Sequence, residues 1–283
     1  MPRTKIIRAA CRASALGGVL SALLWMAAAR ADELGDSKIN REALIGIFYD
    51  FKQDQQRRPN PDIGAYRATG NYTNSREAEL YYAQIEKFIY GGYDEGMLNR
   101  YFRASRALYT TQIFIPNRPA SSGPKAFGVE KFVEPTLWLA HYKGQVIPPV
   151  PGVYEFVASA DGFIAIAVNG ENVLVKHLQD NDRYLKQLGG SRAGKAANGT
   201  LRHSLPFKSD GKTPLDLDIL LAEAGGVFNA FVLYRRKGET YARNADGQEI
   251  LPVFQLAPRE IPKAAAGQMP AHARPVEYWK AVP

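Results

Sequence analysis

The sequence predicts a mainly β protein, an antiparallel β-barrel or β-sandwich with a helical insertion. Three observations lead to this fold class. From residue 107 onward, short apolar runs alternate with Pro, Gly and Asn at the spacing of an antiparallel fold. Asn169-Gly170 stands between two of these runs, and Asn-Gly is the strongest short-range signal for a β-hairpin. Before that point, residues 75–90 repeat apolar side chains at helical spacing.

The first 31 residues have the pattern of a secretory signal peptide. A basic start that includes Arg3 and Lys5 precedes an apolar run over 13–29, and Ala29-Arg30-Ala31 supplies small residues before a cleavage site. A membrane anchor needs about 20 strongly apolar residues, whereas this run is shorter and contains Gly and Ser. We therefore expect an exported protein, periplasmic, at the cell surface or extracellular, with no stable membrane span after cleavage.

Cleavage of the signal peptide would change both the cysteine content and the net charge of the chain. The one cysteine, Cys11, lies within the signal, so the mature chain has no disulfide and no thiol chemistry. The signal also carries five basic residues and no acidic ones, and its loss lowers the formal net charge from +8 to +3. A weakly basic exported chain does not have the charge of a nucleic-acid-binding protein. Residues 32–283 are numerous enough to bury a large core without metals or crosslinks.

The next part of the chain combines one strand with a helical insertion near 74–103. Residues 44–54 form a first apolar strand. Asn74 followed three residues later by Glu77 is typical of a capping box, which predicts a helix over 75–90 with one face on the core. A shorter helix that extends to Phe102 is expected to follow it.

The rest of the β domain is expected to end near Leu256. Nine apolar runs are predicted to form strands or parts of strands, at 108–115, 136–146, 153–159, 163–168, 171–176, 201–205, 215–222, 227–236 and 250–256. Residues 257–283 are then a Pro- and Ala-rich tail, a composition that favours extended or disordered chain. The domain boundaries predicted from the sequence are therefore 1–31, 32–256 and 257–283.

The order of motifs in this region resembles the protective-antigen-type module, also written PA-fourteen. The segments GQVIPPVPGVYEF (144–156), SADG (159–162) and VNGENVL (168–174) follow one another as in that family. The segment LDLDILLAEAGGVFNAFVLYRRKG (215–238) resembles the closing pair of strands. The resemblance covers residues 44–256, with the helical segment as an insertion. It implies a two-sheet β-barrel or sandwich that is usually exported and not catalytic, and that in several branches binds carbohydrate through loops at one end.

One turn departs from the family pattern. In sugar-binding branches, the resemblance implies two adjacent Asp residues that coordinate Ca²⁺, and here the two positions are Ala160 and Asp161. Calcium prefers about 6–8 oxygen ligands, so the missing carboxylate should weaken such a site greatly. We therefore interpret Asp161 mainly as a residue that favours the turn. We expect no metal and no other cofactor.

Several apparent motifs lack the context that their chemistry requires. GGSRAGKA (189–196) fits a phosphate-binding loop, but Ala196 stands where Ser or Thr must reach Mg²⁺, and no buried strand precedes it. The four histidines have no metal-binding spacing. Asp216 and Asp218 alternate with apolar residues, as on a solvated strand face. We therefore predict that the chain is not an enzyme and binds no nucleotide.

Two groups of residues admit both a structural and a binding interpretation. Trp138 and Tyr142 share one face of a predicted strand and could stack on sugar rings, but a core position also suits the large area of the Trp ring. Arg100, Arg103 and Arg106 follow at helical spacing, and could either grip an acidic polymer or complement the end of a helix.

The expected ligand surface combines the 160–163 turn with the long 178–200 connection, because loops at one end of such a fold carry binding residues. Asp161 can accept hydrogen bonds from hydroxyl groups, Tyr184 offers a stacking face, and four side chains offer cationic donors, Arg183, Lys186, Arg192 and Lys195. The predicted function is a Ca²⁺-independent binding module for carbohydrate or a cell-envelope polymer, with an acidic polysaccharide as the favoured partner. The alternative is a structural or assembly protein that uses this scaffold to contact an envelope protein.

The signal-peptide pattern yields a first testable expectation. Cleavage after Ala31 should leave Asp32 as the N-terminal residue of the exported chain. Intact-mass measurement of the exported protein checks this, and a mass that retains residues 1–31 would contradict it.

Overall fold

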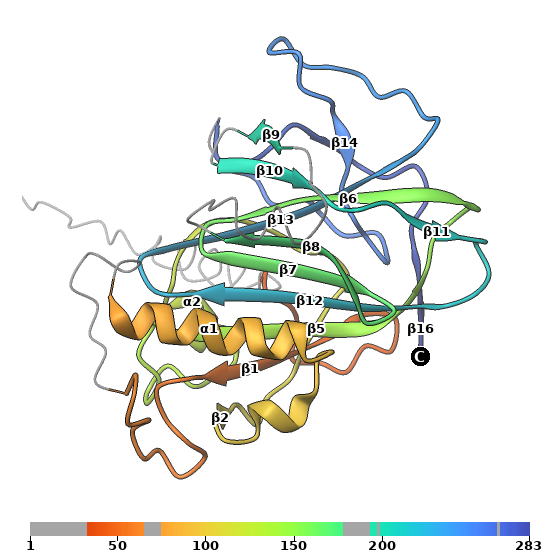
Figure 1. The fold of residues 1–283 in the computed structure, drawn as a ribbon. Coiled ribbons are helices and arrows are strands. Elements are labelled where there is room, and N and C mark those ends of the chain that lie inside the picture. The colour runs from red at the N-terminus through yellow and green to blue at the C-terminus, as the bar shows by residue number, and fades with distance from the viewer. Residues whose placement is uncertain (1–32, 65–74, 178–192, 197–198, 265–266) are drawn as a thin grey trace, which may run out of the picture. The chain divides into compact units, whose positions relative to one another are not determined.

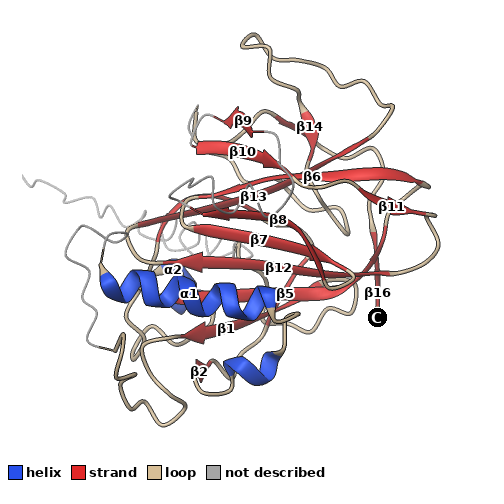
Figure 2. Cartoon of the chain, in the orientation of Figure 1, coloured by secondary structure: helices blue, strands red, loops and turns tan. Residues whose placement is uncertain are grey.

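In a computed structural model of the chain, residues 33–64, 75–177, 193–196, 199–264 and 267–283 are described. Within them, two antiparallel β-sheets pack face to face, and one long helix lies on the outer face of the first sheet (Figures 1 and 2). The mainly β, antiparallel fold class predicted from the sequence is confirmed.

The first sheet has eight strands among the described residues. Their order is β2-β1-β5-β12-β7-β8, with β3 beside β1 and β16 beside β5. All pairs in this sheet are antiparallel. The strands are β1 (Leu44–Asp50), β2 (Phe102–Arg103), β3 (Leu108–Thr110), β5 (Trp138–Ile147), β7 (Phe163–Val168), β8 (Glu171–His177), β12 (Leu215–Glu223) and β16 (Lys280–Val282).

The second sheet has the order β4-β13-β6-β10-β9, with β11 beside β6. Both sheets keep free edge strands, so the described architecture is a sandwich and not a closed barrel. The strands of the second sheet are β4 (Phe114–Pro119), β6 (Gly152–Ala160), β9 (Ala193–Ala196), β10 (Gly199–His203), β11 (Phe207–Ser209) and β13 (Val227–Arg236). A short parallel pair, β14 (Leu251–Pro252) with β15 (His272–Ala273), completes the strands.

The main core lies between the sheets and follows from the two-residue alternation of their strands. Tyr154, Phe156 and Ala158 of β6 point into it from one side, and Trp138 and Ala140 of β5 from the other. The sequence left Trp138 and Tyr142 with two interpretations, and the structure supports the core interpretation. Both side chains are 0% exposed.

The outer face of the first sheet is also apolar, and helix α1 (Arg76–Tyr90) covers it (Figure 1). Every residue of β7 is buried, so this strand is apolar on both faces. Small side chains such as Ala165, Ala167 and Ala222 face the helix and leave room for its large residues. The buried stripe of α1 is Ala78, Tyr81, Tyr82, Ile85, Phe88 and Ile89, which is the spacing of one helix face.

The helix predicted over 75–90 is therefore confirmed, but its cap is different. Ser75 is the N-cap, and its hydroxyl accepts a hydrogen bond from the Ala78 backbone N–H at 3.1 Å. The shorter helix is a 3₁₀ turn, η1 (Glu95–Leu98), and Phe102 already belongs to β2. Its predicted extension is wrong because Phe102 hydrogen-bonds across to Gln53 O. A further short helix, α2 (Ser122–Ala126), lies between β4 and β5.

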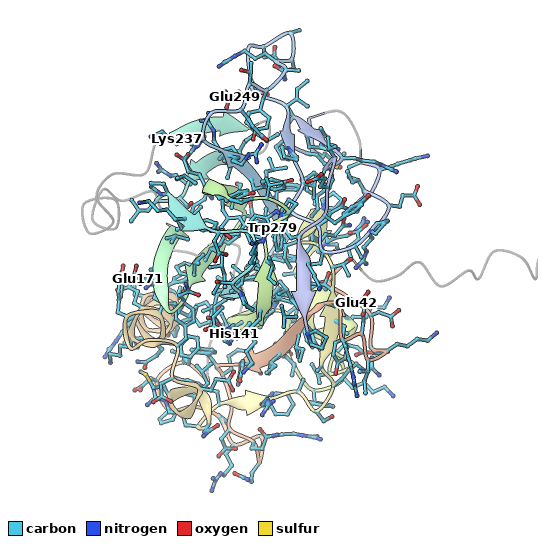
Figure 3. All side chains as sticks on the ribbon, turned by 90° about the vertical axis from the view of Figure 1, so that its right-hand side faces the viewer. Glu42, His141, Glu171, Lys237, Glu249 and Trp279 are labelled. Carbon is cyan, nitrogen blue, oxygen red and sulfur yellow. The ribbon has the colours of Figure 1, made fainter. Side chains whose placement is uncertain are left out.

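Residues 257–283 contribute to the packing in a way that their composition did not indicate. Trp279 is 1% exposed and packs against Tyr154, Phe156 and Phe254 (Figure 3). The adjacent strand β16 pairs with the end of β5. The large area that the Trp ring buries helps to hold this Pro- and Ala-rich segment on the core.

The packing of α1 on the sheet leads to a stability prediction. Ile85→Ala should lower the free energy of unfolding by about 2–5 kcal/mol, because it opens a cavity between the helix and the sheet. Arg76→Ala is the matched control on the exposed side of the same helix, with an expected change within about 0.5 kcal/mol. Urea unfolding of both variants checks this, and equal effects would contradict the burial of the helix stripe.

Candidate functional site

One end of the sandwich brings together polar and ionisable side chains from β8, β12, β13 and the turn between β6 and β7. Ala160 pairs with Ala230 of β13, and Phe163 pairs with Ala222 of β12, so the turn between β6 and β7 bridges the two sheets. The Asp161 backbone N–H donates to Asn229 O at 3.2 Å. We name this region the Asp161 end, defined by Asp161, Lys176, Glu223 and Asn229.

Gly162 allows the turn to approach β12 closely. A Cβ at this position would lie 2.4 Å from Ala222 O and 3.1 Å from Glu223 Oε2. Only glycine fits without displacement of the backbone. The Asp161-Gly162 sequence therefore sets the turn against the end of β12, where Glu223 is the last residue.

Glu223 is a buried carboxyl group with an unusual environment. Its side chain is 2% exposed, its Oε1 accepts a hydrogen bond from Gly225 N at 2.6 Å, and its Oε2 has no hydrogen-bond partner. Burial raises the pKa of Glu223 to about 8, and the nearby Asp161 carboxylate adds to this effect. At neutral pH the group is therefore mainly protonated and uncharged.

Asp161 and Lys176 form the charged part of the site. The Lys176 ammonium donates to Ala160 O at 2.7 Å, which holds it at the base of the turn. Burial raises the pKa of Asp161, and the positive charge of Lys176 opposes this rise. No described residue donates a hydrogen bond to the Asp161 carboxylate, and the residue is only partly buried. Within the described part of the chain, its oxygens therefore have no hydrogen-bond donor.

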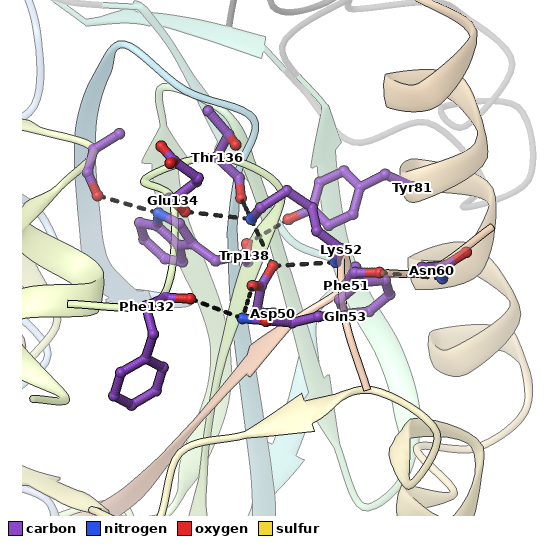
Figure 4. Close-up of polar contacts among 11 residues, drawn as sticks. Asp50, Phe51, Lys52, Gln53, Asn60, Tyr81, Phe132, Glu134, Thr136 and Trp138 are labelled. Carbon is purple, nitrogen blue, oxygen red and sulfur yellow. Dashed lines mark hydrogen bonds and ion pairs between the residues drawn. The ribbon is translucent and has the colours of Figure 1, made fainter. Parts of the chain in front are cut away.

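A second buried acid, Asp50, lies at the same end of the first sheet (Figure 4). Asp50 is opposite Trp138, which is in turn opposite Glu223, so the two acids flank one residue of β5. The Asp50 carboxylate contacts the Lys52 ammonium at 2.5 Å and Gln53 Nε2 at 2.8 Å. The Tyr81 hydroxyl of α1 donates to Trp138 O between them. These contacts tie β1 and the helix to the base of the site.

Of the residues that the sequence predicted for the ligand surface, the structure places Asp161 at this end. Arg183, Tyr184, Lys186 and Arg192 lie outside the described residues. Lys195 belongs to β9, where its backbone pairs with Thr200 of β10.

Sequence reasoning did not select Glu223 and Lys176 as site residues. Glu223 belongs to the segment 215–238 that carried the family resemblance. Its position at the end of a predicted strand, just before Gly225, could have marked it as a site residue. Lys176 interrupts the end of an apolar strand, yet nothing local indicates that its ammonium reaches Ala160, 16 residues away.

The structure also places the other candidates from the sequence. Asp218 contacts the buried His141 ring at 2.7 Å, and Asp216 accepts a hydrogen bond from Gln145 at 2.9 Å. Each acid therefore has a partner on the neighbouring strand β5. Arg100 stacks on Tyr101 with its guanidinium 4.8 Å from the ring centre. The helical spacing of the three arginines is not realised, since η1 ends before Arg100.

Arg103 lies in β2, and Arg106 packs against Gly128. Nowhere in the described chain do three His, Cys, Asp or Glu side chains gather closely enough to hold a metal ion. None of the described helices has the length and apolarity needed to cross a membrane.

Comparison with known proteins gives similarities only at the level of structure. No protein-family model and no curated protein matches the chain. Solved structures that are similar include a PA14 sugar-binding domain from an RTX adhesin, with 14% identity and a TM-score of 0.38 over 82% of this chain and 98% of that chain. The PA14 domain of the MpAFP antifreeze protein has 12% identity and a TM-score of 0.38, over 70% and 84% of the two chains.

The Epithelial Adhesin 9 A domain from Candida glabrata, solved with Galb1-3GlcNAc, has 11% identity and a TM-score of 0.40, over 73% and 88% of the two chains. The family that the sequence resembles thus recurs among these structures.

The environment of Glu223 predicts a pH-dependent stability. Its pKa is raised from 4.5 to about 8 by folding, so its contribution is complete below pH 4.5 and is lost as the pH rises toward about 8. Glu223→Gln should remove much of this decline, because the amide stays neutral at every pH. Within that window, the free energy of unfolding of the parent chain should fall by up to about 1.4 kcal/mol per pH unit.

Denaturant unfolding between pH 4 and 9 measures the effect. The exposed Glu171→Gln is the control, and it should keep the pH profile of the parent chain. An unchanged profile in Glu223→Gln would show that Glu223 does not retain its proton in the folded state.

Proposed function

We propose that this chain is an exported, non-catalytic module that binds a carbohydrate or cell-envelope polymer at the Asp161 end without Ca²⁺. The observation that carries the proposal is the Asp161 carboxylate itself. A turn that joins both sheets fixes its position, and the residue is partly exposed. No described residue donates a hydrogen bond to its oxygens. Hydroxyl groups of a sugar are donors of the required kind.

Lys176 supports Ca²⁺ independence. Its ammonium supplies positive charge beside Asp161, and the hydrogen bond to Ala160 O holds it there. A divalent cation at the same carboxylate would be repelled by this fixed charge. With Ala160 in place of a second Asp, the turn also has one carboxylate fewer to offer as a ligand.

The geometry favours binding over glycoside hydrolysis. A hydrolase needs two carboxyl groups on either side of the bond that breaks. Asp161 is the more accessible acid of the described pair, whereas Glu223 is 2% exposed and lies beneath the turn. The protonated Glu223 therefore serves the packing of this end and is out of reach of a substrate.

The charge of the adjoining connection suggests the class of polymer. Lys176 is near the end of β8, and the chain continues directly into the 178–200 connection, which carries Arg183, Lys186, Arg192 and Lys195. An acidic polysaccharide could meet these cations directly, while its hydroxyl groups bond to Asp161. The assembly alternative, in which the same end contacts an envelope protein, remains as an outcome of the test.

Removal of two basic side chains tests the proposal. The double variant Arg192→Ala with Lys195→Ala should bind an acidic polysaccharide about 3- to 10-fold more weakly, because exposed ion pairs contribute up to about 1 kcal/mol each. The remaining affinity should also depend less on salt. Titrations with an acidic and a neutral polysaccharide, each at two salt concentrations, measure both effects.

The double variant Lys208→Ala with Lys212→Ala is the matched control, since it removes the same charge from exposed positions near the other end of β6. It should bind like the parent chain. EDTA should change neither the affinity nor the melting temperature. Equal weakening in both double variants, or no polysaccharide binding at all, would favour the assembly alternative, and a loss of binding in EDTA would contradict Ca²⁺ independence.

A further inference from the structure

A pocket lies at the end of strands β6 and β13 that is opposite the Asp161 end. Its volume is about 430 Å³, within the range of about 300–1,000 Å³ that is common for small-molecule sites. Tyr154 and Tyr234 contribute to its lining from these two strands, and Tyr241 contributes from the loop that follows. Tyr154 precedes Asp161 by seven residues of nearly continuous strand, so the two regions are about 20 Å apart.

Three tyrosines give the pocket an aromatic lining with fixed orientation. The Tyr154 hydroxyl donates to Val150 O at 2.7 Å. Trp279 packs edge-on against both Tyr154, at 5.2 Å, and Tyr234, at 5.5 Å, and so supports these rings from the core. Burial raises the pKa of Tyr154 and raises that of Tyr241 to about 12, so both phenols remain neutral. The aromatic part of the lining is thus uncharged and held in a defined orientation.

The polar side of the pocket is an ordered hydrogen-bond network. Glu239 accepts from the Arg236 guanidinium at 2.5 Å and from the Tyr241 hydroxyl at 2.5 Å. The Arg236 backbone N–H donates to the same hydroxyl at 2.8 Å. Gly152 lets the Arg236 side chain lie flat across β6, since a Cβ there would be 2.8 Å from Arg236 Cδ. The network therefore presents donors and acceptors in fixed positions.

The charges around this pocket select for a neutral ligand. Two cationic side chains, Arg236 and Arg274, are balanced by two anionic ones, Glu239 and Glu277. An ionic ligand gains no net attraction from such a lining. A molecule with an apolar face and many hydroxyl groups can instead pack on the aromatic rings and bond to the paired charges.

From the lining, the ordered network and the charge balance, we infer that this pocket is a binding site for a neutral saccharide unit of one or two rings. The site is independent of the Asp161 end, in both position and ligand charge. The chain therefore carries one end for an acidic polymer and another for an uncharged sugar.

Saturation-transfer NMR and calorimetric titration with a panel of neutral mono- and disaccharides test this inference. At least one sugar should bind saturably, with little dependence on salt, because no net charge is involved. Tyr241→Ala should weaken that binding at least 10-fold, since it removes a ring and a partner of Glu239. Glu239→Gln is a second, milder variant that keeps the shape of the pocket and should also weaken binding.

The controls separate this site from the proposed function. Arg192→Ala with Lys195→Ala should leave neutral-sugar binding unchanged, and the melting temperature of each pocket variant should confirm that it is folded. The inference is overturned if no neutral saccharide binds, or if Tyr241→Ala and Glu239→Gln both bind like the parent chain. It is equally overturned if a proline-rich peptide binds at this pocket and the sugars do not displace it.

Discussion

The eight-stranded sheet is apolar on both faces, and both faces must be removed from water. Strand β7 shows this most clearly, since all six of its residues are buried. The second sheet covers one face, and helix α1 covers the other. Each pair of layers buries a large apolar area, which is the main favourable contribution to folding. Along the middle of the strands there is consequently little room for polar groups that bind a ligand.

This constraint places the ionisable side chains of the candidate site at the ends of the strands. At one end, Asp50, Asp161 and Glu223 follow the last apolar residues of β1, β6 and β12. The apolar layers beneath them also lower the local polarity, which is why burial dominates the pKa of Glu223. A charge is kept there where a partner is built in, as Lys52 is for Asp50.

The two ends of the sandwich differ in how they satisfy their polar groups. The Asp161 end combines a protonated acid, a partly buried carboxylate and an ammonium bound to a backbone oxygen. The opposite end closes Arg236, Glu239 and Tyr241 into a network with balanced charge. Both arrangements depend on the register between β6 and β13, because Ala160 and Tyr154 each face a defined residue of the neighbouring strand. A slip of one residue would turn both sets of side chains to the wrong face.

The sequence by itself determined the features that depend on near neighbours. The helix over 75–90 follows from its 3.6-residue period, and Asn169-Gly170 forms its hairpin with positive φ values of 53° and 78°. The sequence placed the cap at Asn74, whereas Ser75 is the N-cap, because the period identifies the face of the helix but not its first residue. The strands from β5 to β8 were predicted within two residues of their observed bounds, because apolar alternation and turn residues are local signals.

Only the tertiary structure decided which distant residues meet and how far each is from water. The contact of Lys176 with Ala160, the raised pKa of Glu223 and the burial of Trp279 all depend on contacts between residues that are not neighbours in the sequence. A composition rich in Pro and Ala gave no indication that residues 257–283 would supply a core side chain. Periodicity reports which face of a strand is apolar, but not which layer will cover it. The desolvation that sets a pKa or encloses a pocket arises only when those layers pack together.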